Sequence, residues 1–263
     1  MAENYIYNSE KIIFKHKVSE NLECNAYSMH VHAAYEIIYF VEGDATHVIE
    51  DRKYKLKAGD LIIIRPLRYH FIQIDSPARY ERYDILFDPV RNKVEGVPLI
   101  PADVEIINIF DNPLATDVFN KFDAYKKGYD NDTFERIAPI LISELLYSIG
   151  LMDSTPPSDI ATASAIISGA IKYINENICT LKSVSEIASS LFVSESYLFR
   201  LFKKELHKTP KKYIMEKRLL FASKRIKNGE RPLEAALSCG FSDYTTFYRN
   251  YTAYFGYPPS RKE

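Results

Sequence analysis

Apolar residues recur at helical spacing in two similar stretches near the end of the chain. The first stretch runs from Ser183 to Pro210 and the second from Arg231 to Pro259. Each begins with a short helix of apolar periodicity, breaks at a serine or a Ser-Asp pair, and continues as a longer helix rich in aromatic and basic residues. We call the two stretches the first repeat and the second repeat. Their layout is typical of a helix-turn-helix, whose second helix lies in the DNA major groove.

The spacing of the apolar residues assigns an inward face to each helix. In the first repeat Ser194 is a favourable N-cap for the second helix. In the second repeat Gly240 can take the left-handed conformation that the turn requires. The side chains expected to face inward are Val184, Ile187, Ala188, Leu191, Leu198, Leu201 and Phe202 in the first repeat, and Leu233, Ala236, Leu237, Phe247, Tyr251, Tyr254 and Phe255 in the second.

A basic amphipathic helix over residues 211–228 is predicted to join the repeats, and Asn228-Gly229 is a signal for its end. A continuous helix between the repeats would fix their separation. If both repeats enter successive major grooves on one face of the DNA, they should lie about 34 Å apart.

The chain up to about residue 90 shows the pattern of β-strands. Short runs rich in Ile, Val, Tyr and Phe alternate with turn signals, which favours a sandwich or barrel. The expected strands are residues 35–41, 46–50, 60–64, 70–74 and 80–87. From about residue 102 to 152 the pattern becomes helical, with a first helix marked by Ile106, Ile109 and Phe110, a second over residues 118–125 and a third over residues 137–149, with Pro139 in its first turns.

Two domains are therefore predicted on this chain of 263 residues. They are an all-β domain with appended helices over residues 1–152 and an all-α domain over residues 161–263, joined by a polar, proline-containing linker at 153–160. The chain is nearly neutral, at −1, but residues 159–263 carry 17 basic against 10 acidic residues and the rest carries 17 against 25. A basic module on an acidic body is what phosphate contact favours.

The segment from about Ile166 to Arg261 resembles the DNA-binding domain of the AraC/XylS family of bacterial transcription regulators. The residues that carry the resemblance are Ile187-Ala188, Ser194, Tyr197-Leu198, Arg200-Leu201-Phe202-Lys203, Thr209-Pro210, Tyr213-Ile214, Arg218-Leu219, Ala222, Gly240-Phe241-Ser242-Asp243, Phe247, Arg249, Tyr254-Phe255-Gly256 and Pro258-Pro259. The resemblance implies base-reading positions at Ser196, Phe199 and Arg200, and at Tyr244, Thr245, Thr246 and Arg249. Ser194 and Lys203 complete the expected DNA-contacting set.

Arginine offers a forked pair of donors, so Arg200 and Arg249 are expected to reach guanine edges or phosphates. Three positions depart from the family pattern. Phe192 stands where the family often has a turn glycine, Ala235 replaces a larger apolar residue, and Thr252 replaces a usual lysine. These departures are expected to affect the packing of the repeats and their affinity for DNA.

A second constellation lies in the β region and consists of His30, His32 and Glu36, followed by His70. The first three share parity, so on one extended strand they would point to one face. Together with Gly43, Gly59-Asp60 and Pro66 they resemble the two motifs of the cupin barrel, the usual sensor domain of this regulator family. In metal-binding cupins these four positions hold the ion.

Three interpretations of these four residues stay open. They could bind a divalent metal, since three imidazoles and a carboxylate suit Fe, Mn, Ni, Cu or Zn. They could instead hydrogen-bond a polar effector such as a sugar, with Tyr39 and Arg68 nearby, or they could be structural. The metal-free effector site is preferred, so no cofactor is expected, although a divalent metal is possible.

The resemblance implies a transcription regulator, an activator or a repressor, that is not an enzyme and whose binding to double-stranded DNA is controlled by an effector in the barrel. The residue types around the pocket favour a carbohydrate-like effector, and a cytoplasmic location is expected. The resemblance also implies a homodimer, with the helix over residues 134–151 as the candidate interface, and contact with RNA polymerase. Cys24, Cys179 and Cys239 fit reduced thiols, and no apolar run approaches the roughly 20 residues of a membrane helix. The alternatives are a metal-dependent cupin oxygenase or isomerase with a DNA-binding tail, and an effector-independent regulator with a purely structural barrel.

Overall fold

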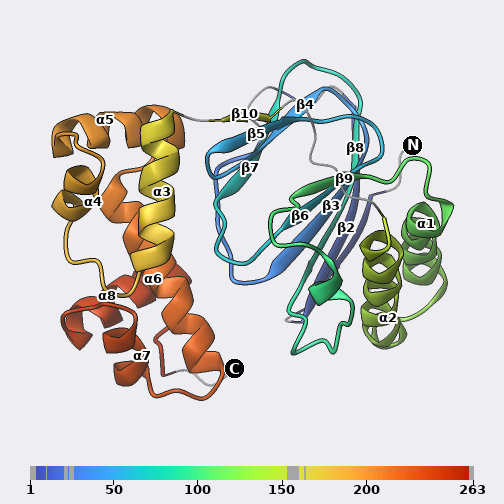
Figure 1. Ribbon diagram of the computed structural model, residues 1–263. Helices are drawn as coiled ribbons and strands as arrows, with labels where there is room; N and C mark the ends of the chain where they lie inside the picture. The colour runs from blue at the N-terminus through green and yellow to red at the C-terminus, as the bar shows by residue number, and fades with distance from the viewer. Residues whose placement is uncertain are drawn as a thin grey trace. The chain divides into compact units, whose positions relative to one another are not determined.

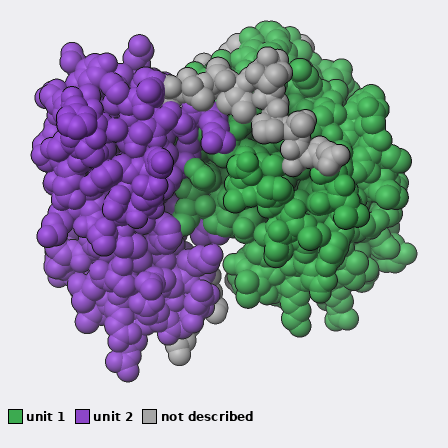
Figure 2. Space-filling model, viewed as in Figure 1, with its two compact units in different colours: residues 1–30, 34–49, 53–160 green, residues 31–33, 50–52, 161–263 purple. Residues whose placement is uncertain are grey.

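The computed structural model describes residues 4–9, 11–20, 23, 27–152, 160–162 and 164–260, and the chain divides into two compact units (Figures 1 and 2). The β unit comprises residues 1–30, 34–49 and 53–160, and the helical unit comprises residues 161–263 with the short segments 31–33 and 50–52. Cys24 and all of the predicted linker except Ile160 lie outside the described residues.

The β unit contains two sheets, whose strands are ordered β1-β2-β8-β3-β6-β9 and β10-β5-β4-β7. Their bounds are Tyr5–Asn8 (β1), Ile12–Ser19 (β2), Tyr35–Glu42 (β3), Ala45–Ile49 (β4), Arg52–Lys55 (β5), Asp60–Ile64 (β6), His70–Ile74 (β7), Tyr80–Phe87 (β8), Ile106–Asn108 (β9) and Ile160–Thr162 (β10). The five strands predicted from the sequence are confirmed to within one residue at each end. The prediction of an all-β domain followed by an all-α one is confirmed as well.

Alternation along the strands divides the β unit into two apolar cores. Ile38 and Phe40 of β3 face the four-stranded sheet and pack with Ile72 and Ile74 of β7. Ile37, directly before Ile38 in the sequence, faces the opposite way and packs with the helices. We call these the inner and the outer face of the six-stranded sheet. Because side chains alternate with a period of two, β3, β6, β8 and β9 each contribute to both cores.

Two helices, α1 (Pro113–Gly128) and α2 (Asn131–Gly150), cover the outer face (Figure 1), and a short 3-10 helix, η1 (Val97–Leu99), precedes them. The helix predicted around Ile106, Ile109 and Phe110 is wrong, because residues 106–108 form β9 and pair with β6. An apolar run of this length cannot be assigned to a helix or a strand by periodicity alone. Here the run becomes a strand because it pairs with β6 at the edge of the sheet. Pro139 lies well inside α2 rather than in its first turns, since α2 begins at Asn131.

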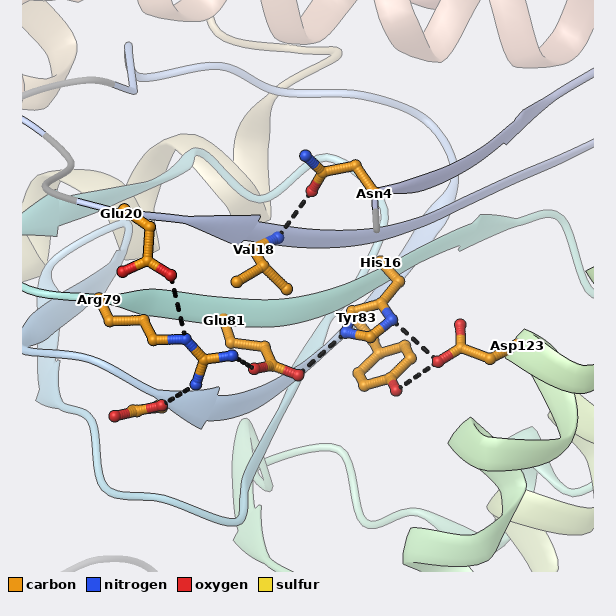
Figure 3. A network of polar contacts seen from close by, with 9 residues as sticks. Asn4, His16, Val18, Glu20, Arg79, Glu81, Tyr83 and Asp123 are labelled. Atoms are coloured by element: carbon orange, nitrogen blue, oxygen red, sulfur yellow. Dashed lines mark hydrogen bonds and ion pairs between the residues drawn. The ribbon is translucent and has the colours of Figure 1, made fainter. Parts of the chain in front are cut away.

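A polar network ties α1 to the outer face of the sheet (Figure 3). The imidazole of His16 on β2 lies 2.8 Å from Asp123 of α1 and 3.0 Å from Glu81 of β8. The Tyr83 hydroxyl donates to the same Asp123 carboxylate at 2.7 Å, and the Tyr83 ring stacks on His16 with centroids 3.9 Å apart. Arg79 donates to Glu81 at 2.7 Å, so the carboxylate of Glu81 is shared between two cationic groups when His16 is protonated.

The helical unit contains six helices within the described residues. They are α3 (Ala165–Asn177), α4 (Val184–Ser190), α5 (Glu195–Leu206), α6 (Pro210–Lys227), α7 (Pro232–Ser238) and α8 (Tyr244–Phe255). Five of them have a side-chain N-cap, supplied by Ser164, Ser183, Ser194, Thr209 and Asp243. The predicted cap at Ser194 and the predicted joining helix, α6, are therefore confirmed. Cys179 and Cys239 are free thiols.

The His16 network predicts a specific dependence of stability on pH. Burial lowers the pKa of His16, but its hydrogen bonds to Asp123 and Glu81 outweigh burial and raise the pKa above the usual 6.5. A raised folded-state pKa stabilises the fold fully below the unfolded pKa, and this contribution disappears as the pH rises through the folded value. The free energy of unfolding should therefore fall as the pH rises above about 6.5, and His16→Gln should remove this part of the decline. Urea denaturation of both proteins across this range is the measurement, and equal pH slopes would contradict the assignment.

Candidate DNA interface and effector site

The two longer helices of the repeats, α5 and α8, present their predicted reading positions outward. On α5, the side chains of Ser196, Phe199, Arg200 and Lys203 are exposed, while Leu198 and Phe202 are buried, as predicted. Ser194 is exposed and its hydroxyl accepts from the backbone amide of Tyr197 at 3.2 Å, so it both caps α5 and borders the outward surface.

On α8 the outward set is less uniform. Thr245 and Arg249 are exposed, whereas Tyr244 and Thr246 are half-buried. Tyr244 packs on Phe247 with ring centroids 5.8 Å apart, so only one side of its ring is available to a partner. Phe247 and Tyr251 are buried as predicted, but Tyr254 is exposed.

The first helix of the second repeat packs differently from the prediction. Leu233 and Leu237 of α7 are about half exposed, and Ala235 and Ala236 are its buried residues. Both alanines belong to a core with Leu219, Phe247 and Tyr251. The small side chain of Ala235 allows α7 to approach α6 and α8 with a different face, which is the physical meaning of that departure from the family pattern.

The turns of the two repeats both use a left-handed residue. In the second repeat this residue is Gly240, with φ 86°, as predicted. In the first repeat it is Phe192, with φ 55° and a side chain that is 97% exposed. A bulky residue in this conformation is strained, since only glycine adopts it without steric penalty.

One arginine connects the segment before the first repeat to the turn of the second repeat. Arg218 of α6 donates from Nε to the carbonyl of Ile178 at 2.8 Å and from Nη1 to the carbonyl of Gly240 at 2.8 Å, and its Nη2 donates to Leu181. Ile178 and Leu181 precede the first repeat, and Gly240 is the turn of the second. Three backbone carbonyls from two segments therefore share a single guanidinium.

The structure brings His30, His32, Glu36 and His70 together, with one ligand atom from each within 4.8 Å of the others. His70 Nε2 lies 2.7 Å from the Glu36 carboxylate. The Nδ1 atoms of His30 and His70 lie 2.9 Å from the carbonyls of Ser28 and Arg68 respectively. These contacts favour Nδ1–H and leave Nε2 as the inward ligand atom, which is the arrangement of metal-binding histidines. The residue set and its geometry therefore fit a divalent metal.

Two details of the predicted site differ from the prediction. His30 and His32 precede β3 and do not lie on it, so strand parity is not what aligns them; instead His30 exchanges two backbone hydrogen bonds of 3.0 Å with His70. Tyr39 lies on the outer face, where it stacks on Phe119 of α1 with centroids 4.4 Å apart. It is one residue out of phase with Glu36 and Ile38, so it cannot share their face. Arg68 lies in the turn before β7 and touches the cluster through its backbone carbonyl.

Three buried polar residues on the inner face were not predicted. They are His47 of β4 and Arg82 and Asp84 of β8, each less than 9% exposed. Both ring nitrogens of His47, the Nε of Arg82 and the Oδ1 of Asp84 make no hydrogen bond within the described part of the protein. Arg82 and Asp84 lie 3.6 Å apart, and the Arg82 guanidinium lies 4.4 Å from the centre of the Tyr27 ring.

Burial sets the protonation of these residues. Desolvation raises the pKa of the Asp84 carboxyl to about 7, and the nearby Glu36 adds to the shift. Burial and the proximity of His70 hold the pKa of His47 well below its usual value, so its imidazole is neutral. The inner face thus offers a carboxyl that donates or accepts, a neutral imidazole that does both, and a guanidinium that only donates.

The sequence contained only a weak signal for these residues. Polar Arg82 and Asp84 alternate with apolar Tyr83 and Ile85, which is also the pattern of a strand with one solvated face. Only their pairing with β3, which aligns Asp84 with Ile38, places them inside.

Comparisons with known proteins identify both parts of the chain. Residues 19–102 match the family model described as an AraC-like ligand binding domain, and residues 187–262 match a helix-turn-helix domain. Regulatory protein SoxS of Escherichia coli is 32% identical over 96 residues, which are 36% of this chain and 90% of SoxS. An uncharacterized HTH-type transcriptional regulator of Bacillus subtilis, YfiF, is 23% identical over 88% of this chain and 77% of its own length.

A third relative, the probable transcriptional regulator LumQ of Photobacterium leiognathi, is 33% identical over 90 residues, which are 34% of this chain and 36% of LumQ. The match therefore spans about a third of that relative. Among the described residues, no helix is both long and apolar enough to cross a membrane.

The packing around Gly240 predicts a severe effect of a single methyl group. A Cβ atom at Gly240 would lie 2.5 Å from the carbonyl oxygen of Cys179 and 2.8 Å from the Arg218 guanidinium, in addition to the strain of a positive φ. Gly240→Ala should lower the free energy of unfolding by roughly 2–4 kcal/mol. Gly229→Ala is the matched control, since its φ is 96° and no atom lies within 4 Å of its Cβ position. That control should lose only about 1 kcal/mol in chemical denaturation, and equal losses would show that the contact with Arg218 and Cys179 is unimportant.

Proposed function

The chain belongs to the AraC/XylS family of transcription regulators, and from this premise we propose that it binds specific operator DNA through its two repeats under the control of a polar, carbohydrate-like effector held on the inner face of its β unit. The observation that carries the effector proposal is the set of buried polar atoms of His47, Arg82 and Asp84 that lack a hydrogen-bond partner within the described protein. A buried polar atom without a partner is destabilising, so such groups are normally satisfied by water or by a ligand.

The chemistry of these groups favours a neutral, hydroxyl-rich ligand. Asp84, His47, Glu36 and Arg82 alternate acceptors and donors, and a sugar hydroxyl can serve as either at each position. The Tyr80 ring on the same face adds an apolar surface, and burial raises its pKa to about 12, so its hydroxyl remains a donor. An anionic ligand would meet the carboxyl groups of Glu36 and Asp84, which disfavours it at this face.

The DNA-binding proposal rests on charge and on the exposed side chains of α5 and α8. Residues 159–263 carry an excess of seven positive charges, while the rest of the chain is negative. Arg200 and Arg249 are exposed on helices whose N-termini are capped by Ser194 and Asp243. An effector can control such binding only if its affinity differs between two states of the protein.

A homodimer and contact with RNA polymerase are further parts of the proposal. Ile140, Tyr147 and Leu151 leave an exposed apolar stripe along the outer side of α2 and just beyond its end. Their spacing of seven and four residues places them on one helical face, which suits pairing with the same helix of a second copy. A dimer of this kind would bring four repeats to a pair of half-sites.

A second candidate function follows from the metal-like geometry of His30, His32, Glu36 and His70. A divalent metal held there would act as a Lewis acid for an oxygenase or isomerase reaction on a small polar substrate. His30 and His70 would present Nε2 and the Glu36 carboxylate would supply charge. In that case the helical unit would be an accessory to the enzyme.

The effector proposal predicts a ligand-induced rise in stability that does not depend on metal. Thermal unfolding of the full chain should be followed with pentoses, hexoses and their uronic acids, with and without EDTA. One neutral sugar at a hundredfold excess over its Kd should stabilise the protein by about 2.7 kcal/mol in either condition. Asp84→Asn should abolish the response, whereas Asp132→Asn, which changes an exposed carboxylate on α2, should preserve it. An EDTA-induced loss of stability without any sugar response would instead support the metal-dependent enzyme.

The DNA-binding proposal predicts a difference between specific and random DNA. Arg200→Ala and Arg249→Ala should each weaken binding to a selected operator by about 1–3 kcal/mol and leave binding to random DNA nearly unchanged. Lys203→Ala is the comparison, because a phosphate contact should weaken both kinds of binding and reduce the slope of log K against log salt by about 1. Equal losses on both DNAs for the arginines would make them phosphate contacts as well.

A further inference from the structure

The outer face of the six-stranded sheet carries a pocket, separate from the inner polar cluster. It has a volume of about 220 Å³ and is lined by Ile37, Ile63 and Phe87 of the sheet, by Leu146 of α2 and by Arg65 and Ala102. Ile37 and Ile63 are directly paired across β3 and β6, so they form a flat apolar floor. The pocket lies on the side of the sheet that faces the helices, since the apolar floor residues and Leu146 all belong to the outer core.

Arg65 gives this apolar pocket a single positive charge. Its guanidinium donates to the carbonyls of Val104, at 2.6 Å, and Pro101, at 2.5 Å. Asp103 and Glu105 are near enough to act on it electrostatically, but within the described residues no carboxylate forms an ion pair with it. Glu105 accepts instead from the Tyr54 hydroxyl at 2.5 Å. A guanidinium has five N–H donors, and the two carbonyls leave donors and most of the charge uncompensated.

Arg65 is suited to bind a ligand, because its guanidinium lies at the pocket and is held in place. The two carbonyl bonds hold the guanidinium plane at the pocket, and burial lowers its pKa without removing its charge. A charged hydrogen bond at the edge of an apolar cavity is stronger than one in water, because the surroundings have a lower dielectric constant. The tyrosine of the lining, Tyr35, stacks on Phe87 with centroids 5.8 Å apart and extends the apolar wall.

We propose that this pocket binds a small apolar carboxylic acid, with its carboxylate on Arg65 and its hydrocarbon part on Ile37, Ile63, Phe87 and Leu146. The volume is below the roughly 300–1,000 Å³ of pockets for drug-sized ligands, so the ligand is a short acyl chain or a single ring. One arginine and an apolar floor match one carboxylate and one hydrocarbon group. A sugar would leave most of its hydroxyls unpaired on this floor, and a phosphate, with its larger charge, would find Arg65 as the one cation among the lining residues.

The site would give the β unit a second ligand, of a chemical class opposite to that of the inner face. Glu36 and Ile37 are neighbours on β3, and Ile64 and Arg65 are neighbours at the end of β6. Each pair presents one residue to each face, so both ligands would contact the same two strands. The proposal does not depend on the inner-face effector, because the two sites share no side chain.

Titration calorimetry of the full chain with hexanoate and cyclohexanecarboxylate tests the proposal. Hexan-1-ol and cyclohexylmethanol are the neutral counterparts, with nearly the same hydrocarbon part. At least one carboxylate should bind about tenfold or more tightly than its alcohol, which is the expected worth of one charged hydrogen bond. No binding by either carboxylate, or equal binding of acid and alcohol, would overturn the proposal.

Variants locate the site. Arg65→Gln removes the charge, and Ala102→Phe fills the mouth of the pocket at an exposed position while keeping Arg65. Each should weaken the carboxylate about tenfold or more, and Arg91→Gln, which removes an exposed arginine outside the pocket, should not. If Arg65→Gln fails to fold for want of its two carbonyl bonds, Ala102→Phe decides alone. Binding that survives Ala102→Phe but is lost in Asp84→Asn would assign the ligand to the inner face and refute the outer site.

Discussion

The helical unit depends on one guanidinium. Arg218 lies on α6, the helix that connects the repeats, and it donates to the carbonyls of Ile178, Leu181 and Gly240. The first two carbonyls belong to the approach to α4 and the third to the turn before α8. The planar fork of the guanidinium therefore holds the segment before the first repeat and the turn of the second repeat against α6 at the same time. Gly240 is required at that turn, since any side chain would occupy the position of the fork. The guanidinium thus adds a second connection, besides α6 itself, between the segment that leads into α4 and the turn that leads into α8.

The β unit depends on a different constraint, the alternation of side chains along shared strands. β3 and β8 contribute Glu36, Arg82 and Asp84 to the inner face and Ile37, Tyr83 and Phe87 to the outer face. The inner face therefore combines an apolar core with buried polar groups, and the outer face is an apolar surface under α1 and α2, with the His16 network at one edge and Arg65 at another. Buried polar groups destabilise a fold unless they are paired, which is why the effector proposal is centred on this face.

Much of this architecture could be predicted from the sequence. Strands β3, β4, β6, β7 and β8, the caps at Ser194 and Asn228-Gly229, and the outward faces of α5 follow from local periodicity and turn chemistry, which act within a few residues. The errors arise where long-range pairing decides. β9 is a strand because it pairs with the edge of β6, and α7 buries Ala235 beside the predicted Ala236 while Leu233 and Leu237 stay half exposed, because its packing on α6 and α8 selects the face.

The candidate site was predictable in part for the same reason. His30, His32, Glu36 and His70 were selected by their residue types and their resemblance to a motif, and they do lie together. Tyr39 lies on the outer face instead of at the predicted site. The sequence also gives no clear sign that His47, Arg82 and Asp84 are buried on the inner face, because it does not show which side of a strand lies against the other sheet. The His30–His70 backbone pairing, which aligns two imidazoles forty residues apart, likewise has no local signal.

The central claim is that two repeats, joined through α6 and Arg218, read DNA as a single unit. Selection of bound fragments from random DNA by the full-length protein, followed by sequencing, tests it most directly. The account predicts enriched sequences with two short elements whose centres are about 10–10.5 base pairs apart, one helical turn, and affinity that falls steeply with salt. Enrichment of a single short element, or of none, would contradict it.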